Sequence, residues 1–174
     1  MILDIGCGKS KRGDIGIDYS RESCADVIAD AHYLPFRDYT FDKVISFNVL
    51  EHSSNPIQFL YEQHRVLKQN GVVSCVTDNA QYCKWSVLNF SFGGESHPNP
   101  WKDHYMIFYP ENVKRLMKLA SLRPVAERYY LQRRKTDLFA KLLITLRIWR
   151  KACLYKRFRI IGIKQEANNC ATIA

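Results

Sequence analysis

The first eighteen residues constrain this chain more than any other part of it. Residues 2–5 have the apolar character of a buried strand, and Gly6 and Gly8 lie in the turn that follows. Glycines there allow positive backbone dihedrals and leave no Cβ between the backbone and a bulky ligand. Asp18 ends a second apolar segment, where a carboxylate can accept hydrogen bonds from a ribose. This spacing predicts a cofactor site at the carboxyl ends of two neighbouring strands.

A dinucleotide site is the competing interpretation of these glycines. That site requires the pattern Gly-x-Gly-x-x-Gly at the start of a helix, but Lys11 occupies the third glycine position. An acid, Asp4, also stands two residues before Gly6. Residues 9–14 are too few for the helix of a complete βαβ crossover, so we expect a loop there. These differences disfavour NAD and FAD.

Further motifs follow the glycine turn in order along the first part of the chain. They are Gly16-Ile17-Asp18-Tyr19-Ser20, Ala29-Asp30-Ala31, Leu34-Pro35-Phe36, residues 41–46, Val49-Leu50-Glu51-His52 and residues 65–71. The ordered series resembles the class I S-adenosylmethionine (SAM)-dependent methyltransferases, and in particular the small-molecule branch called type 11. Each motif is weak by itself, whereas the series is specific.

The resemblance implies an α/β, Rossmann-like sheet of seven strands in the order 3-2-1-4-5-7-6, with the last strand antiparallel. The apolar segments expected to form strands are 2–5, 16–18, 27–29, 44–47, 72–76, 125–131 and 158–164. Helices are expected after Asn55-Pro56, ending at Asn70-Gly71, and after Pro110-Glu111. With 174 residues, the chain is expected to be a single domain, 1–174.

The resemblance also implies SAM as the cofactor and S-adenosylhomocysteine as its product. The residues expected to bind the cofactor are Asp4, Gly6, Cys7, Gly8, Asp18, Tyr19, Asp30, Ala31, Asn48 and Val49. Asp30 would accept a hydrogen bond from the adenine amino group, and Ala31 would give its backbone N–H to a ring nitrogen. Two alternatives stay open: Tyr19 as a half-exposed aromatic at a strand end, and Asp30 as a turn or capping residue.

Catalysis by such a site depends mainly on placing the acceptor in line with the methyl group. A general base is needed only where the acceptor must lose a proton. His52 and His104 are the candidates, with Glu51 and Tyr105 behind them, and a non-catalytic position beside the cofactor is the alternative for both histidines. The histidines of the chain lack a metal-ligand spacing, so no metal site is expected.

Two later segments have unusual compositions. Residues 78–109 are rich in aromatic and polar side chains, and we expect them to form an acceptor-binding lid, with a hydrophobic cover for the sheet as the alternative. Residues 133–159 hold ten Lys or Arg and one acid, so they carry the whole net charge of +9. Within them, residues 137–156 are expected to form a basic amphipathic helix between the last two strands. That helix could cover the core with its basic face in solvent, lie on an anionic membrane surface, or bind nucleic-acid phosphates.

These observations favour a SAM-dependent methyltransferase with a small-molecule, sugar- or lipid-linked acceptor. An RNA methyltransferase and a non-catalytic SAM-binding partner protein are the alternatives; the short loop, and a first strand that no helix precedes, motivate the second. Residues 46–49 do not resemble the Asn/Asp-Pro-Pro-aromatic motif of amino-group DNA methyltransferases. Six scattered cysteines and the lack of a long apolar run predict a cytoplasmic protein, with membrane contact only through the basic helix. A homodimer is a further possible assembly that we expect from the sequence.

Overall fold

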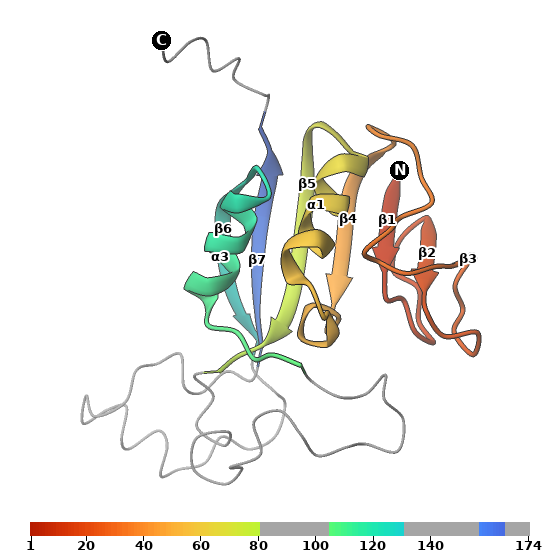
Figure 1. Cartoon of the computed structure of the whole chain (residues 1–174), viewed down its shortest axis with the longest axis horizontal. Coiled ribbons are helices and arrows are strands. Elements are labelled where there is room, and N and C mark those ends of the chain that lie inside the picture. Colours follow the sequence, from red (N-terminus) through yellow and green to blue (C-terminus); the bar gives the residue numbers. More distant parts are fainter. Residues whose placement is uncertain (81–104, 131–156, 166–174) are drawn as a thin grey trace, which may run out of the picture.

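The computed structural model describes residues 1–80, 105–130 and 157–165. These residues form one seven-stranded sheet with α-helices against it (Figure 1). The strands are β1 (Ile2–Ile5), β2 (Ile15–Asp18), β3 (Val27–Ile28), β4 (Phe41–Phe47), β5 (Leu67–Asp78), β6 (Leu122–Tyr130) and β7 (Arg157–Lys164). The helices are α1 (Pro56–Val66) and α3 (Pro110–Leu119), and the short 3-10 helix η1 (Leu50–His52) precedes α1.

The strands lie in the order β3-β2-β1-β4-β5-β7-β6. All neighbouring pairs from β3 to β5 are parallel, and β7 is antiparallel to both β5 and β6. The predicted α/β sheet and its antiparallel last strand are confirmed. The chain moves outward from β1 to β3 on one side and from β4 on the other, and this reversal opens a crevice at the carboxyl ends of β1 and β4.

A loop replaces the first crossover helix, as the sequence predicted. The carboxylate of Asp4 accepts a hydrogen bond from the backbone N–H of Arg12 at 2.6 Å. At the far end of the loop, Asp14 and Ile2 exchange two hydrogen bonds of 2.7 and 2.8 Å, one to the Asp14 carboxylate and one to the Ile2 carbonyl. Local polar contacts therefore hold this short connection against β1 in place of a packed helix.

Helix α1 begins as predicted but ends earlier. The side chain of Asn55 accepts a hydrogen bond from the N–H of Gln58 at 3.1 Å, which caps the first turn, and Pro56 follows it. The helix stops at Val66, so the predicted end at Asn70-Gly71 is wrong.

The carbonyl groups at the end of α1 are bonded by a side chain from near the other end of the chain. Lys164 of β7 donates from Nζ to the carbonyls of His64 and Leu67, at 2.8 Å each. Carbonyls of a last helical turn have no partner within the helix, so a buried ammonium group can satisfy them and let Leu67 start β5 at once.

The core lies between the central strands and the two helices, which Figure 1 shows on one face of the sheet. Val113 and Met117 of α3 and its C-cap residue Ala120 are fully buried, and Leu116 is partly buried against the same core. The largest buried side chains of the sheet and of α1 include Leu3, Ile5, Phe41, Phe59, Leu60 and Phe158.

Two predicted segments fall largely outside the described residues. Only the two ends of the predicted lid, 78–80 and 105–109, are described, and the predicted basic helix, 137–156, is not. In the described part of the chain, the helices are too short or too polar to cross a membrane.

Candidate functional site

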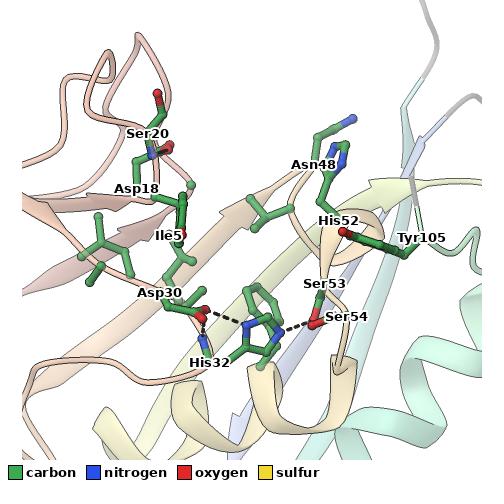
Figure 2. A pocket seen from close by; sticks show the side chains of 17 residues that line it. Ile5, Asp18, Ser20, Asp30, His32, Asn48, His52, Ser53, Ser54 and Tyr105 are labelled. Carbon is green, nitrogen blue, oxygen red and sulfur yellow. Dashed lines mark hydrogen bonds and ion pairs between the residues drawn. The ribbon is translucent and has the colours of Figure 1, made fainter. Parts of the chain in front are cut away.

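A cavity of about 370 Å³ opens where the parallel strands end (Figure 2). Its volume is in the range of sites for small molecules and cofactors. It is lined by Ile5, Gly6, Ile17, Asp18, Tyr19, Ser20, Ala29, Asp30, Ala31, His32, Asn48, Val49, His52, Ser53, Ser54, Phe59 and Tyr105. Figure 2 shows Asp18 and Ser20 on one side of this space, and Asn48, His52 and Tyr105 on the other.

The glycine turn forms the floor of the cavity. Gly6 has φ +66°, and a Cβ added there would lie 2.3 Å from Cγ2 of Val49. Gly8 has φ +55° but would meet no atom, so its requirement is conformational only. The N–H of Gly6 donates to the carbonyl of Ile17 at 2.8 Å, which fixes the turn against β2. The sequence therefore needs glycine at position 6 for two independent reasons.

Asp18 at the end of β2 links this floor to the neighbouring wall. Its Oδ2 accepts the N–H of Gly8 and its Oδ1 accepts the N–H of Ser20, both at 2.8 Å. A carboxylate has about four acceptor positions, so two backbone donors leave capacity for hydroxyl groups of a ligand in the cavity. Asp18 thus orders the turn and offers an acceptor at the same time.

A second acid, Asp30, lies on the same wall after β3. Its Oδ1 accepts from the backbone N–H of His32 at 2.8 Å and from the ring Nδ1 at 2.6 Å. The other ring nitrogen, Nε2, lies 2.8 Å from Oγ of Ser53 (Figure 2). Neither His32 nor Ser53 is among the residues expected at the site from the sequence. Only the position of His32, two residues after an Asp that follows a strand, could have suggested the bond between His32 and Asp30.

The opposite wall begins at the end of β4. Asn48 has φ +57° and donates from Nδ2 to Oδ1 of Asp78 at 3.4 Å, a long hydrogen bond. His52 follows on η1, and Tyr105 reaches the wall from a distant part of the chain. The backbone N–H of Tyr105 donates to the carbonyl of Glu51 at 2.9 Å. This wall is therefore assembled from segments that are far apart in sequence.

Glu51 lies beneath that wall and not on it. Its side chain is fully buried, and Oγ1 of Thr77 donates to its Oε2 at 2.7 Å. Burial raises the pKa of Glu51 to about 7, against a weaker opposing effect of the Thr77 hydrogen bond. Glu51 does not line the cavity, so it has no direct contact with a ligand there.

Three residues expected at the cofactor do not line the cavity. Asp4 is fully buried; its Oδ2 binds the Arg12 N–H, its Oδ1 has no partner among the described residues, and burial raises its pKa. Cys7 is buried as well, and burial raises the pKa of its thiol to about 12. Gly8 acts through its bond to Asp18. These three residues shape the turn that carries Gly6.

The remaining expected residues divide clearly. Those that line the cavity are Gly6, Asp18, Tyr19, Asp30, Ala31, Asn48, Val49 and His52. His104 lies outside the described residues. Within the described ranges, no group of three or more His, Cys, Asp or Glu side chains is arranged to hold a metal ion.

Comparison with known proteins agrees with this geometry. Residues 3–75 match the family described as a methyltransferase domain, of type 11. They belong to that family. The resemblance recognised from the sequence motifs is thereby confirmed, and the family's cofactor is SAM.

Two relatives show how far the likeness extends. An uncharacterised protein of Methanocaldococcus jannaschii is 33% identical over 107 residues, which cover 53% of this chain and 43% of that protein. A protein of Mycolicibacterium smegmatis, named as a probable SAM-dependent methyltransferase, is 31% identical over 119 residues, or 58% of this chain and 44% of its own length. The chain thus spans less than half the length of these relatives.

Solved structures share the fold along nearly the whole chain. A SAM-dependent methyltransferase from Archaeoglobus fulgidus has a TM-score of 0.64 at 20% identity, and the match covers 94% of this chain and 85% of that one. A putative methyltransferase of Haloferax volcanii, solved with the activator Trm112, has a TM-score of 0.66 at 15% identity, covering 95% and 82%. These likenesses establish the Rossmann-like methyltransferase sheet.

The residues on the cavity wall fit SAM. A ribose needs acceptors and adenine needs an acceptor for its amino group, and Asp18 and Asp30 provide both on one wall. Gly6 carries no side chain, and a Cβ there would collide with Val49, so this close turn at the floor requires glycine. The cofactor's size and polarity therefore agree with a cavity that the protein has already formed.

Proposed function

We propose that this protein transfers the methyl group of SAM to a small-molecule, sugar- or lipid-linked acceptor. The observation that carries the proposal is the arrangement of one cavity: Asp18 and Asp30 lie on one wall, and His52 and Tyr105 lie on the other. One wall suits an adenosine group. The other is left for the reacting end of the cofactor and for the acceptor.

Each wall has its own task in this proposal. Asp18 holds the ribose, Asp30 and the backbone of Ala31 hold adenine, and the turn at Gly6 with the end of β4 receives the methionyl part. When bound, SAM supplies a methyl group on a cationic sulfur, which an oxygen, nitrogen or carbon nucleophile can take by direct displacement.

His52 is the residue best placed to accept a proton from such a nucleophile. It lines the cavity from η1, and its N–H donates to the carbonyl of Val49 at 2.9 Å, which fixes the backbone beside the floor. A neutral imidazole has one ring nitrogen that can accept a proton, so His52 can act as the base where the acceptor must lose one. Glu51, the residue before His52, is fully buried, and in this proposal it supports the wall and takes no part in the reaction.

The first test is calorimetric titration with S-adenosylhomocysteine, followed by incubation of the protein with radiolabelled SAM and fractionated cell extract. We expect binding of the product and label in a lipid, sugar or small-molecule fraction. Label confined to RNA would favour the nucleic-acid alternative. Binding without any label in any fraction would favour a non-catalytic SAM-binding protein, and no binding at all would refute the proposal.

A protein partner is a second element of the proposal. The Haloferax volcanii neighbour was solved in complex with a methyltransferase activator. For this reason the transfer experiment includes an arm with added Trm112. Label that appears only in this arm would show that the chain depends on an activator, whereas equal label in both arms would show that the chain acts alone.

A further inference from the structure

His32 holds the carboxylate of Asp30 through two hydrogen bonds that meet on one oxygen. The backbone N–H of His32 lies 2.8 Å from Oδ1, and its ring Nδ1 lies 2.6 Å from the same atom. An ionised carboxylate only accepts, so Nδ1 carries the ring proton. Asp30 Oδ2 bonds to none of the described residues, and the Asp30 side chain is 45% exposed on the cavity wall. One oxygen is fixed by the protein and the other is left for a ligand.

The ring of His32 is itself fixed on its far side. Nε2 lies 2.8 Å from Oγ of Ser53, and the ring meets Phe59 edge to face, with centroids 6.4 Å apart. The side chain of Gln58 donates to the His32 carbonyl at 3.1 Å. With only 17% of its side chain exposed, His32 has contacts on several sides that select one ring orientation. The bond to Asp30 is thus formed before any ligand arrives.

We infer that His32 is a positioning residue that makes this site select the 6-amino group of the adenine ring. The inference rests on the proposed function, since it takes the base of SAM as the ligand of Asp30. Because two donors occupy Oδ1, the carboxylate presents Oδ2, an acceptor, to the cavity. A base with a hydrogen-bond donor at this place is preferred to a base without one.

The sharpest consequence concerns the substitution Asp30→Asn. The oxygen of a carboxamide accepts hydrogen bonds, whereas its nitrogen donates them. Where His32 fixes the oxygen, the amide nitrogen faces the cavity and meets the amino group of the base, donor against donor. Without that restraint, the amide rotates, and its oxygen accepts from the amino group as the carboxylate did. The two cases predict opposite ligand preferences.

Calorimetric titration with two ligands measures the preference: S-adenosylhomocysteine, and its analogue with hydrogen in place of the 6-amino group. We expect the wild-type protein to bind S-adenosylhomocysteine about tenfold more tightly, the value of a hydrogen bond to a charged group. Asp30→Asn is expected to bind both ligands about equally or to prefer the analogue. An Asp30→Asn protein that keeps the wild-type preference would overturn the inference.

Variants of His32 separate positioning from folding. His32→Ala is expected to reduce the preference about three- to tenfold, since one of the two donors is lost. His32→Asn can place an amide N–H near the position of Nδ1, so most of the preference should return, and Ser53→Ala should give a smaller loss than His32→Ala. The melting temperature of each variant is recorded in parallel.

Each outcome of these titrations has a distinct meaning. A folded His32→Ala protein with an unchanged preference would contradict the role of the ring. If that variant does not fold, Asp30→Asn still tests whether Oδ1 is fixed, and Ser53→Ala, which removes the contact on the far side of the ring, tests the ring. A wild-type protein that binds neither ligand would refute the proposed function and not this inference alone.

Discussion

The two walls of the cavity are built in different ways. The adenosine wall, with Asp18, Asp30 and His32, comes from one short stretch of chain. Hydrogen bonds from nearby backbone groups hold its two carboxylates, and the His32 ring also contacts a distant segment, at Ser53. The opposite wall joins η1 to Tyr105, which is attached through a backbone bond to the carbonyl of Glu51. The carboxylates of the first wall are therefore held within their own segment, whereas the opposite wall depends on the contact of Tyr105 with a distant segment. Cofactor binding and methyl transfer should therefore respond to different substitutions.

The largest expected effect is at the floor that both walls share. Gly6→Ala should lower the free energy of unfolding by roughly 3–5 kcal/mol, because it adds backbone strain at φ +66° to a collision with Val49. Chemical denaturation of the variant measures this loss.

Gly8→Ala is the matched control for Gly6→Ala. It has a similar backbone conformation but an open Cβ position, so its cost should be only about 1–2 kcal/mol. Adding Val49→Ala to Gly6→Ala should recover part of the stability, since the colliding methyl groups are removed. Equal losses in the two glycine variants would show that the packing against Val49 is unimportant.

The next effect concerns the buried acid beneath the second wall. The pKa of Glu51 is raised by burial from 4.5 to about 7, so the folded protein binds this proton more tightly than the unfolded chain. The contribution to stability is complete below pH 4.5 and is lost as pH rises to about 7. The free energy of unfolding should then fall by roughly 2–3 kcal/mol across this window, and Glu51→Gln should lack that fall. Urea denaturation at several pH values measures it.

Glu62 provides a control of opposite sign. Its pKa is lowered, chiefly by the hydrogen bond from Arg65, so its contribution is present above its ordinary pKa and is lost as the solution becomes more acidic. Glu62→Gln should remove an acid-side loss of stability and leave the window above pH 4.5 almost unchanged. If Glu51→Gln shows the same pH slope as the wild type, the fall belongs to another group, and the second wall does not depend on a neutral Glu51.

A smaller effect tests the adenosine wall alone. Asp18→Ala should weaken S-adenosylhomocysteine binding by about 1–3 kcal/mol, because the ribose and the Gly8 N–H both lose an acceptor. Titration calorimetry measures the change. Asp14→Ala is the matched variant: it also removes a carboxylate bonded to a backbone N–H, that of Ile2, but it lies away from the cavity wall. We expect it to lower the melting temperature without altering affinity, and equal affinity losses in both variants would remove Asp18 from the ligand site.

The positions of Asp18 and Asp30 at one cavity could be predicted from the sequence better than the opposite wall, for a physical reason. Parallel strands place their carboxyl ends on one edge, so Asp18 and Asp30, which each end or follow a strand, must lie close together. The positive φ of Gly6 could likewise be expected from the sequence, because glycine after an apolar strand indicates a tight turn. What was missed is orientation: the pattern located Asp30 but not the His32 ring that fixes one of its oxygens.

Contacts between distant segments were beyond the reach of sequence patterns. Asn70-Gly71 resembles a helix end, yet α1 stops at Val66, because Lys164 of β7 satisfies its last carbonyls across almost 100 residues. Tyr105 was a candidate from the sequence, as part of the expected lid, but its bond to the Glu51 carbonyl is likewise a contact that no local pattern indicates. Periodicity identifies elements, but it does not show which ends of the chain meet.

Substitution of Tyr105 should have the smallest effect on cofactor binding, and it distinguishes most clearly between the roles of the two walls. Its side chain is 58% exposed at the edge of the cavity, so Tyr105→Ala should change S-adenosylhomocysteine affinity less than about threefold. Transfer of label from SAM to the acceptor fraction should fall more strongly, since the ring borders the space left for the acceptor. Tyr105→Phe separates the ring from the hydroxyl: a normal rate would assign the effect to packing, and a reduced rate to a polar contact with the acceptor. A large loss of cofactor affinity with unchanged transfer would reverse the assignment, because it would place the adenosine against the wall that holds Tyr105.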